Sequence, residues 1–352
     1  MRFFLKAKPP RGLTRSAAFC CLCLLAAQPS LASPANEGAT LPSIVNEASG
    51  LAASRQHPGV VWTHNDNIDL PASSRKSQPI LFAISPAGEL LSQITLSDAT
   101  QRDWEAITEA DLGGTPTLIV GDIGDNRGSW PDYRLWFVPE PAKLTPQATI
   151  APTAVLRFRY PDQTQIKDKP SGSARWQGGH DSESMAYDSR SKALLILTKR
   201  EKPARLFSLP LSARTPLNPN TAPPISQQIR QAPVHTAQFI ANLPPLPAPD
   251  FISWLLHPFI SPYADQPTDM ALSPDGSTLA VLTYSALFFF HRAPQQSWQA
   301  ALTAPVRAQA LPFIDQWEGI SYSANGKTLY IVREGTGADT LIPLPAPDLA
   351  PY

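Results

Sequence analysis

Residues 102–126 read RDWEAITEADLGGTPTLIVGDIGDN and place an acidic turn on each side of one short apolar run. The first turn contains Asp103 and Glu105, and the second contains Asp122 and Asp125. The apolar run at 117–120 is long enough for a strand that crosses one layer of a β-sheet. The stretch therefore predicts a sheet unit with carboxylates both before and after its strand.

The acidic part of this stretch recurs along the chain. Each copy has an acidic residue before a small or apolar pair, then a turn, and then an aliphatic or aromatic strand. Two of the turns contain Gly276 and Gly326, which supply the positive φ of a tight hairpin. The copies begin at Glu47, Glu105, Glu183, Asp269 and Glu318, and the strands expected after them lie at 60–62, 117–120, 193–197, 278–282 and 328–332.

Three or four short strands per unit, repeated about every 50 to 85 residues without an amphipathic helix between them, are typical of a β-propeller. We therefore predict an all-β fold, a β-propeller with five to six blades of antiparallel strands around a central channel. Five units are clear, and residues 236–265, or the two chain ends closing the ring, would supply a sixth. A β-sandwich also has many strands, but it gives no reason for an acidic motif at the start of each unit.

The start of the chain has the pattern of a secretory signal peptide, which we expect at residues 1–32. Five basic residues precede an apolar run at 17–27, and small residues follow at 30–32. The run is about half of the roughly 20 residues needed to span a bilayer. We therefore expect cleavage, no stable membrane insertion afterwards, a periplasmic or extracellular location, and a single β-propeller domain over residues 33–352.

The charge balance argues against nucleic acid as a partner. The chain has 29 basic and 29 acidic residues, and five of the basic ones but none of the acidic ones lie in residues 1–32. The remainder has 24 basic against 29 acidic residues, a net charge of about −5. All three cysteines also lie in the signal segment, so the mature chain would contain no thiol. We expect a monomer.

Proline is frequent, with 39 residues in the whole chain. Turns and sheet edges accept proline, whereas helix interiors do not, so we expect short strands with proline-rich outer loops. One proline-rich insertion is expected near 244–263, and its part at 247–263 is also hydrophobic. That part would pack against the blades, cover the channel or dock a partner.

In a propeller the first strand of each blade lines the channel, so the recurring acids would form a ring at its mouth. A second polar set is expected at the far end of each following strand, at 64–67, 122–126, 199–200, 284 and 333–334. Packed carboxylates repel one another, and two solutions remain open. Internal pairing would use Lys199, Arg200 and Arg333, whereas a calcium ion would take oxygen ligands from Asp66, Glu105, Asp122, Asp125 and Asn126.

The order of these motifs resembles a family of secreted bacterial β-propeller proteins, mostly hypothetical proteins, that is akin to esterase-like phytase and gluconolactonase-type propellers. The likeness covers about residues 47–333, and its most specific part is the DWE motif at 103–105 together with GDIGDN at 121–126. The resemblance implies a propeller, a secreted location and a site at the channel mouth. It implies no settled reaction.

Two functions follow from these observations. The first is a secreted propeller that binds a small-molecule or protein ligand at its acidic channel mouth, with calcium as the candidate ion. The alternative is a calcium-dependent hydrolase of the phosphoesterase or lactonase type, in which the metal polarises the substrate and lowers the pKa of a bound water. In that alternative Glu183 or Glu318 is the base, and Lys199, Arg200 or Arg333 holds the anion.

Overall fold

The computed structural model describes residues 38–66, 79–167, 174–246, 263–312, 316–335 and 338–348. The predicted signal peptide and residues 247–262 of the predicted insertion lie outside this range. In the described part of the chain, no helix is long and apolar enough to cross a membrane.

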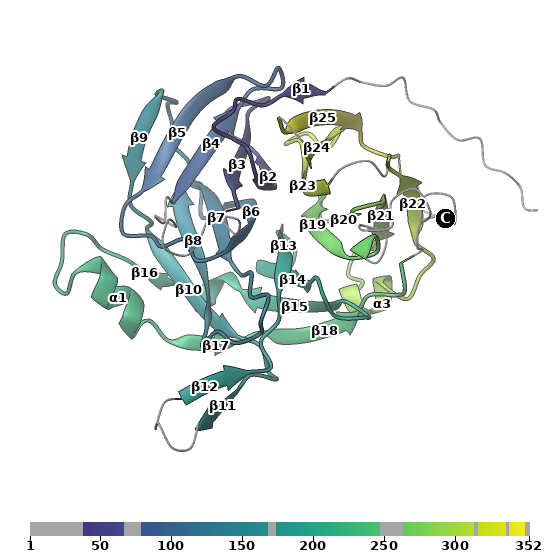
Figure 1. The fold of residues 1–352 in the computed structure, drawn as a ribbon. Helices are drawn as coiled ribbons and strands as arrows, with labels where there is room; N and C mark the ends of the chain where they lie inside the picture. Colours follow the sequence, from purple (N-terminus) through teal and green to yellow (C-terminus); the bar gives the residue numbers. More distant parts are fainter. Residues whose placement is uncertain are drawn as a thin grey trace, which may run out of the picture. The chain divides into compact units, whose positions relative to one another are not determined.

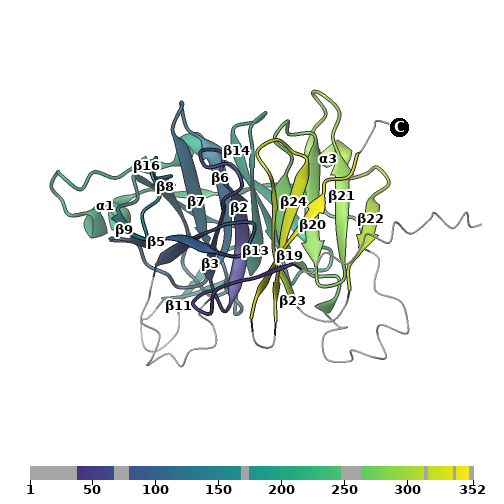
Figure 2. The same ribbon diagram turned by 90° about the horizontal axis from the view of Figure 1, so that it is seen from above.

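Five sheets surround a central axis in the described part of the chain (Figure 1). Their innermost strands contact one another in order around the axis, and the last contacts the first, which closes the ring. Figure 2 shows these strands running along the axis. The fold is a five-bladed β-propeller. The innermost strands are β2 (Ala48–Ala53), β6 (Trp104–Asp111), β13 (Ser182–Asp188), β19 (Pro267–Leu272) and β23 (Gln316–Tyr322).

Each innermost strand is followed outward by antiparallel strands. Blade 1 continues with β3 (Val61–Asn65), β4 (Ile80–Ile84) and β5 (Leu90–Leu96), and β9 (Gln147–Ile150) joins its edge in parallel. Blade 2 continues with β7 (Pro116–Asp122), β8 (Tyr133–Pro139) and β10 (Ala154–Arg159), with β16 (Thr215–Pro216) and β17 (Val234–Thr236) beside β10. Blade 3 continues with β14 (Ala193–Thr198), β15 (Arg205–Pro210) and β18 (Gln238–Asn242).

Blades 4 and 5 complete the ring. Blade 4 continues with β20 (Thr278–Thr283), β21 (Ala286–His291) and β22 (Arg307–Ala310). Blade 5 continues with β24 (Thr328–Glu334), β25 (Thr340–Pro345) and β1 (Ala39–Thr40). The remaining elements are the hairpin β11 (Thr164–Lys167) with β12 (Ala174–Gln177), the 3-10 helix η1 (Leu211–Ala213), and the helices α1 (Ile225–Gln231) and α3 (Trp298–Ala301).

The hydrophobic core lies between neighbouring blades rather than on the channel axis. Strand β7 illustrates why, because successive side chains of a strand point to opposite faces. Leu118 and Val120 pack with Trp62 of blade 1, whereas Ile119 packs with Met185 of blade 3. Both faces of the strand are buried, so the sequence reads as a continuous apolar run. Three further buried clusters fill the other blade interfaces in the same way.

The ring is closed by the two ends of the described chain. Strand β1 pairs antiparallel with β25 as the outermost strand of blade 5, and the backbone N–H of Ala48 donates to Asp339 Oδ2 at 2.7 Å. Residues 236–242 belong to β17 and β18 of blades 2 and 3. The described strands of the segments considered for a sixth blade therefore belong to other blades, and the described residues form five blades. The β-sandwich alternative is excluded by the closed ring.

Candidate functional site

The innermost strands share a β-bulge near their first residues. In four blades one extra residue interrupts the pairing with the next strand, and this residue is Glu105, Glu183, Thr268 or Glu318. In blade 1 the irregularity falls between Ser49 and Ala52. A bulge redirects a side chain, and the three bulged glutamates all line one cavity at this end of the channel.

The predicted equivalence of five ring acids is wrong in blade 4. Thr268 occupies the bulge there, and Asp269 lies one residue beyond it. The fully buried Asp269 carboxylate accepts from the backbone N–H of Met270 and of Ile320, both at 2.8 Å. It therefore joins blade 4 to blade 5 and leaves Glu105, Glu183 and Glu318 as the equivalent acids.

The cavity at the channel mouth has a volume of about 230 Å³. Glu47 and Tyr284 also belong to its walls, so both sets of polar residues expected from the sequence meet here. The walls include seven of the ten residues predicted for the site: Asp66, Glu105, Asn126, Glu183, Lys199, Arg200 and Glu318.

One side of the mouth contains a cluster of three carboxylates. Asp66, Asp103 and Glu105 each offer one oxygen, and these oxygens lie within 4.8 Å of one another. Burial, followed by repulsion from Asp66 and other nearby carboxylates, raises the pKa of Asp103 to about 8. Burial and the same kind of repulsion hold the pKa of Glu105 well above its usual value. The cluster is a candidate metal centre, because an ion would relieve this repulsion.

Glu105 is the most informative member of the cluster. The residue is only 3% exposed, and its Oε1 has no hydrogen-bond partner in the described residues. Leaving a buried acceptor unsatisfied costs about 1–3 kcal/mol, and more when the group is charged. A bound cation would satisfy this oxygen.

The close approach of the backbone to two carboxylates explains why the second acidic turn has a glycine, Gly124, between Ile123 and Asp125. A Cβ at this position would lie 2.5 Å from Glu105 Oε1 and 2.6 Å from Asp103 Oδ2. Only a residue without a side chain lets the backbone approach both carboxylates this closely. The GDIGDN turn therefore forms a wall of the acidic cluster.

Asp122 and Asp125, predicted as metal ligands, lie outside the cavity walls and bind protein donors. Asp122 Oδ1 accepts from the backbone N–H of Arg102 and Asp103, at 3.0 and 2.9 Å, and its Oδ2 accepts from Arg102 Nε at 2.9 Å. Asp125 Oδ1 accepts from Ser129 N at 3.0 Å, and its Oδ2 accepts from Trp130 N and Tyr133 Oη. Both carboxylates hold the loops in place.

The opposite side of the mouth carries an ion pair. Lys199 Nζ donates to Glu183 Oε2 and, at 3.0 Å, to the hydroxyl of Tyr284. Burial raises the pKa of Glu183 to about 7, although Lys199 opposes this shift. Burial alone would lower the pKa of Lys199, but Glu183 and its neighbours hold it well above its usual value. Lys199 is therefore an ammonium group at neutral pH.

Of the remaining predicted residues, Arg200 and Glu318 line the cavity, whereas Arg333 does not. Arg200 donates from Nε to Asp181 and from Nη2 to Asn126, both near the mouth. Burial raises the pKa of Glu318 well above its usual value, with Lys199 acting against the shift. Arg333 lies outside the cavity walls, and its guanidinium carbon is 6.0 Å from the ring centroid of Trp317.

Asp103 is the site residue that the sequence-based ligand set omitted. A usable signal was present, because Asp103 stands only two residues before Glu105 in the repeated acidic motif. Asp122 and Asp125, which the sequence offered as ligands instead, have local backbone partners. The Asp122 and Asp125 side chains bind nearby N–H groups, as aspartate commonly does in turns.

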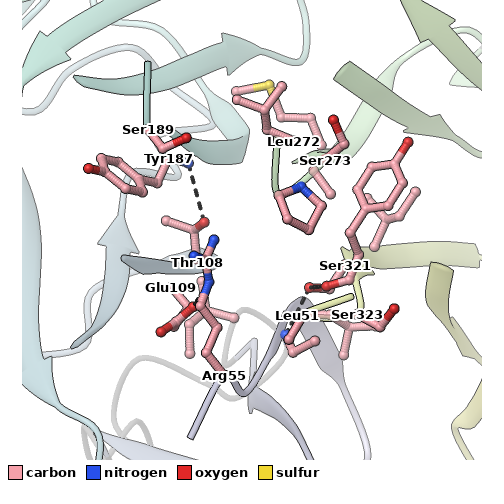
Figure 3. Close-up of a pocket in the computed structure, with 18 residues that line it drawn as sticks. Leu51, Arg55, Thr108, Glu109, Tyr187, Ser189, Leu272, Ser273, Ser321 and Ser323 are labelled. Atoms are coloured by element: carbon pink, nitrogen blue, oxygen red, sulfur yellow. Dashed lines mark hydrogen bonds and ion pairs between the residues drawn. The ribbon is translucent and has the colours of Figure 1, made fainter. Parts of the chain in front are cut away.

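A second cavity lies at the other end of the innermost strands and is shown in Figure 3. Its volume is about 40 Å³, enough for only a few water molecules. Several of its polar groups have partners: Arg55 Nε lies 2.6 Å from Glu109, the N–H of Tyr187 donates to Thr108, and Ser321 accepts from the backbone of blade 1. Glu109 Oε1 has no hydrogen-bond partner in the described residues, but the small volume leaves no room for a ligand larger than water. The acidic mouth is therefore the better candidate site.

Comparisons with known proteins add little about function. No protein-family model and no curated protein matches the chain. Among solved structures, a luciferin-regenerating enzyme is 8% identical over 87% of this chain and 92% of its own, with a TM-score of 0.38. The β-propeller domain of Myceliophteria thermophila Cps50 (Swd1) is 10% identical over 84% and 83%, also at 0.38. The Neurospora crassa Pan2 WD40 domain is 8% identical over 87% and 90%, at 0.37. Scores this low carry no argument about the site.

Proposed function

We propose that this protein is a binding propeller of the periplasm or cell exterior, whose channel mouth holds a calcium ion and, beside it, a small oxyanion ligand. The observation that carries the proposal is the buried Glu105 Oε1, which has no hydrogen-bond partner in the described residues and lies beside Asp103 and Asp66.

The carboxylate cluster suits calcium for a physical reason. Calcium takes six to eight oxygen ligands from carboxylates, carbonyls and water in a flexible geometry. Asp66, Asp103 and Glu105 would supply three of these oxygens, and ligand or water oxygens would complete the shell. The raised pKa of Asp103 means that the ion must displace a proton when it binds near neutral pH.

The opposite wall supports an anionic ligand. Lys199 contributes an ammonium group, Arg200 a guanidinium group and Tyr284 a hydroxyl group to the same cavity. These groups favour phosphate or carboxylate oxygens as partners. An oxyanion between the ion and Lys199 would contact opposite charges on both sides.

A second candidate function is a calcium-dependent hydrolase, and one observation favours it. The pKa of Glu183, about 7, is near the value suited to a general base at neutral pH. Glu183 shares the cavity with the carboxylate cluster. A bound ion would supply a water of lowered pKa there, and Glu183 would accept its proton.

The test is thermal unfolding in calcium or in a chelator, for the wild type and for Glu105→Gln. At calcium 100-fold above Kd, the free energy of unfolding of the wild type should rise by about 2.7 kcal/mol. Glu105→Gln should lose this rise, yet should melt no lower than the wild type in chelator, because glutamine keeps the size of the side chain and cannot carry the charge that burial disfavours. The exposed Glu89 provides a matched control, Glu89→Gln.

A calcium response that is absent from the wild type, or that persists in Glu105→Gln, contradicts the proposal. Titration with inorganic phosphate in the presence of calcium then tests the oxyanion. A screen of lactones and phosphate esters separates the two functions: turnover that needs both calcium and Glu183 supports the hydrolase, and binding without turnover supports the binding protein.

A further inference from the structure

An apolar pocket of about 380 Å³ lies next to the channel mouth, between blades 3 and 4. It is lined by the β14–β15 connection, by residues 243–246 after β18, and by residues 265–267 at the start of β19. Its apolar lining residues include Leu243, Leu246, Pro203, Pro244 and Pro267. Its volume is within the range of small-molecule pockets, which are mostly apolar with a few polar groups.

The walls of this pocket are held by the fold. The backbone N–H of Leu243 donates to Ala204 O at 2.8 Å, which fixes the blade 3 wall. On the blade 4 side, Gln266 N donates to Tyr263 O at 2.8 Å. Ala204 and Leu243 belong to the core between blades 3 and 4, and Leu246 packs against it. These contacts hold the described parts of two walls in place.

Lys199 lies between this pocket and the channel mouth, because it lines both cavities. Its Nζ donates to Glu183 and Tyr284 in the mouth, and a lysine stem offers apolar surface along its length. At the outer rim, Lys202 Nζ lies 2.8 Å from Asp265 Oδ1 in an exposed ion pair between the two walls. A ligand that extends from the mouth past Lys199 would meet the ammonium group in the mouth and apolar surface in the pocket.

We propose that the ligand of the channel mouth is amphipathic. Its oxyanion faces Lys199, and its alkyl or aryl group occupies the pocket between blades 3 and 4. The occupant is a free small molecule. This inference rests on the proposed function, and it adds the chemical class of the ligand.

Binding of n-alkyl phosphates tests the inference. Ethyl, butyl, hexyl and octyl phosphate are titrated in calcium by calorimetry, below their micelle-forming concentrations. Each methylene that enters the pocket should tighten binding up to about fourfold, the equivalent of about 0.8 kcal/mol. Affinity should stop rising once the pocket is full.

Two variants locate the effect. Leu246→Gln makes a half-buried part of the wall polar, and Ala204→Leu fills the pocket; each should flatten the dependence on chain length and leave calcium affinity unchanged. The control Leu90→Gln changes an exposed leucine of blade 1, and it should keep the wild-type dependence. Melting curves confirm that each variant is folded.

The possible results separate this inference from the proposed function. If all chain lengths bind equally well in calcium, the amphipathic ligand is refuted while the ion and oxyanion sites stand. If the wild type does not bind calcium, the proposed function itself is refuted. A chain-length effect that persists in both pocket variants, or binding seen only with phosphatidic acid vesicles, also overturns the inference.

Discussion

Gly124→Ala should disable the proposed calcium site without removing any of its ligands. The new Cβ would lie 2.5 Å from Glu105 Oε1 and 2.6 Å from Asp103 Oδ2, whereas an ordinary contact begins at 3.4 Å. The difference, 3.4 minus 2.5, means that a carboxylate oxygen must retreat by about 0.9 Å. Calcium–oxygen distances span only about 0.3 Å, from 2.3 to 2.6 Å.

The displacement therefore exceeds the tolerance of the ion, and calcium affinity should fall at least about tenfold, or about 1.4 kcal/mol. Stability in chelator should change less, by about 1 kcal/mol, at the low end of overpacking costs, because the displaced atoms end side chains that can rotate. Calorimetric titration with calcium and urea unfolding in chelator measure the two effects.

Gly121→Ala is the matched control in the same loop. Its Cβ would meet Ile123 Cδ1 at 3.2 Å and Cγ1 at 3.3 Å, and no carboxylate is among its three nearest contacts. It should therefore retain calcium binding. If Gly124→Ala binds calcium as tightly as this control, Asp103 and Glu105 are not the ligands.

Three other predictions test separate parts of the structure. Asp269→Ala leaves two buried N–H groups without an acceptor and should cost about 2–4 kcal/mol in urea unfolding; a loss below about 1 kcal/mol would contradict the role of Asp269 between blades. Burial raises the pKa of Glu109 to about 7 from its usual 4.5, with Arg55 acting against the shift. The folded state therefore binds the proton more tightly than the unfolded state, and stability falls as pH rises from 4.5 to 7. Glu109→Gln should remove about 2–3 kcal/mol of that fall, measured by unfolding in chelator at pH 5 and 8, and parallel pH profiles would refute this. Lys199→Met should weaken phosphate binding at least about tenfold with little change in calcium affinity, and equal phosphate affinity in calorimetry would refute its role.

The propeller could be predicted from sequence because each blade has a middle strand that is buried on both faces. The run at 193–197, for example, became β14 (Ala193–Thr198). Such runs are apolar throughout and are separated by recognisable turns, so both the repeat and the strands are visible locally. Outer strands are less visible: β1 and β25 pair across almost the whole chain, and no local pattern specifies that contact.

The candidate site could be predicted in part, for a related reason. The bulged glutamates follow a repeated motif, so Glu105, Glu183 and Glu318 were found together. The sequence-based prediction placed Asp269 at the position of these glutamates, but the bulged residue of blade 4 is Thr268, one residue earlier. The position of the bulge depends on the pairing with the next strand, which the motif does not show. The pairing of Asp122 with Arg102 likewise joins the last residue of β7 to a residue 20 positions earlier, which composition alone does not specify.

The most direct test of the calcium site is the position of the ion in a crystal grown with calcium and, in parallel, with terbium for anomalous scattering. The account predicts one strong peak at the channel mouth, with calcium–oxygen distances of about 2.3–2.6 Å to Asp66, Asp103 and Glu105. A peak at Asp122 and Asp125 instead, or a mouth without an ion at saturating calcium, would contradict it.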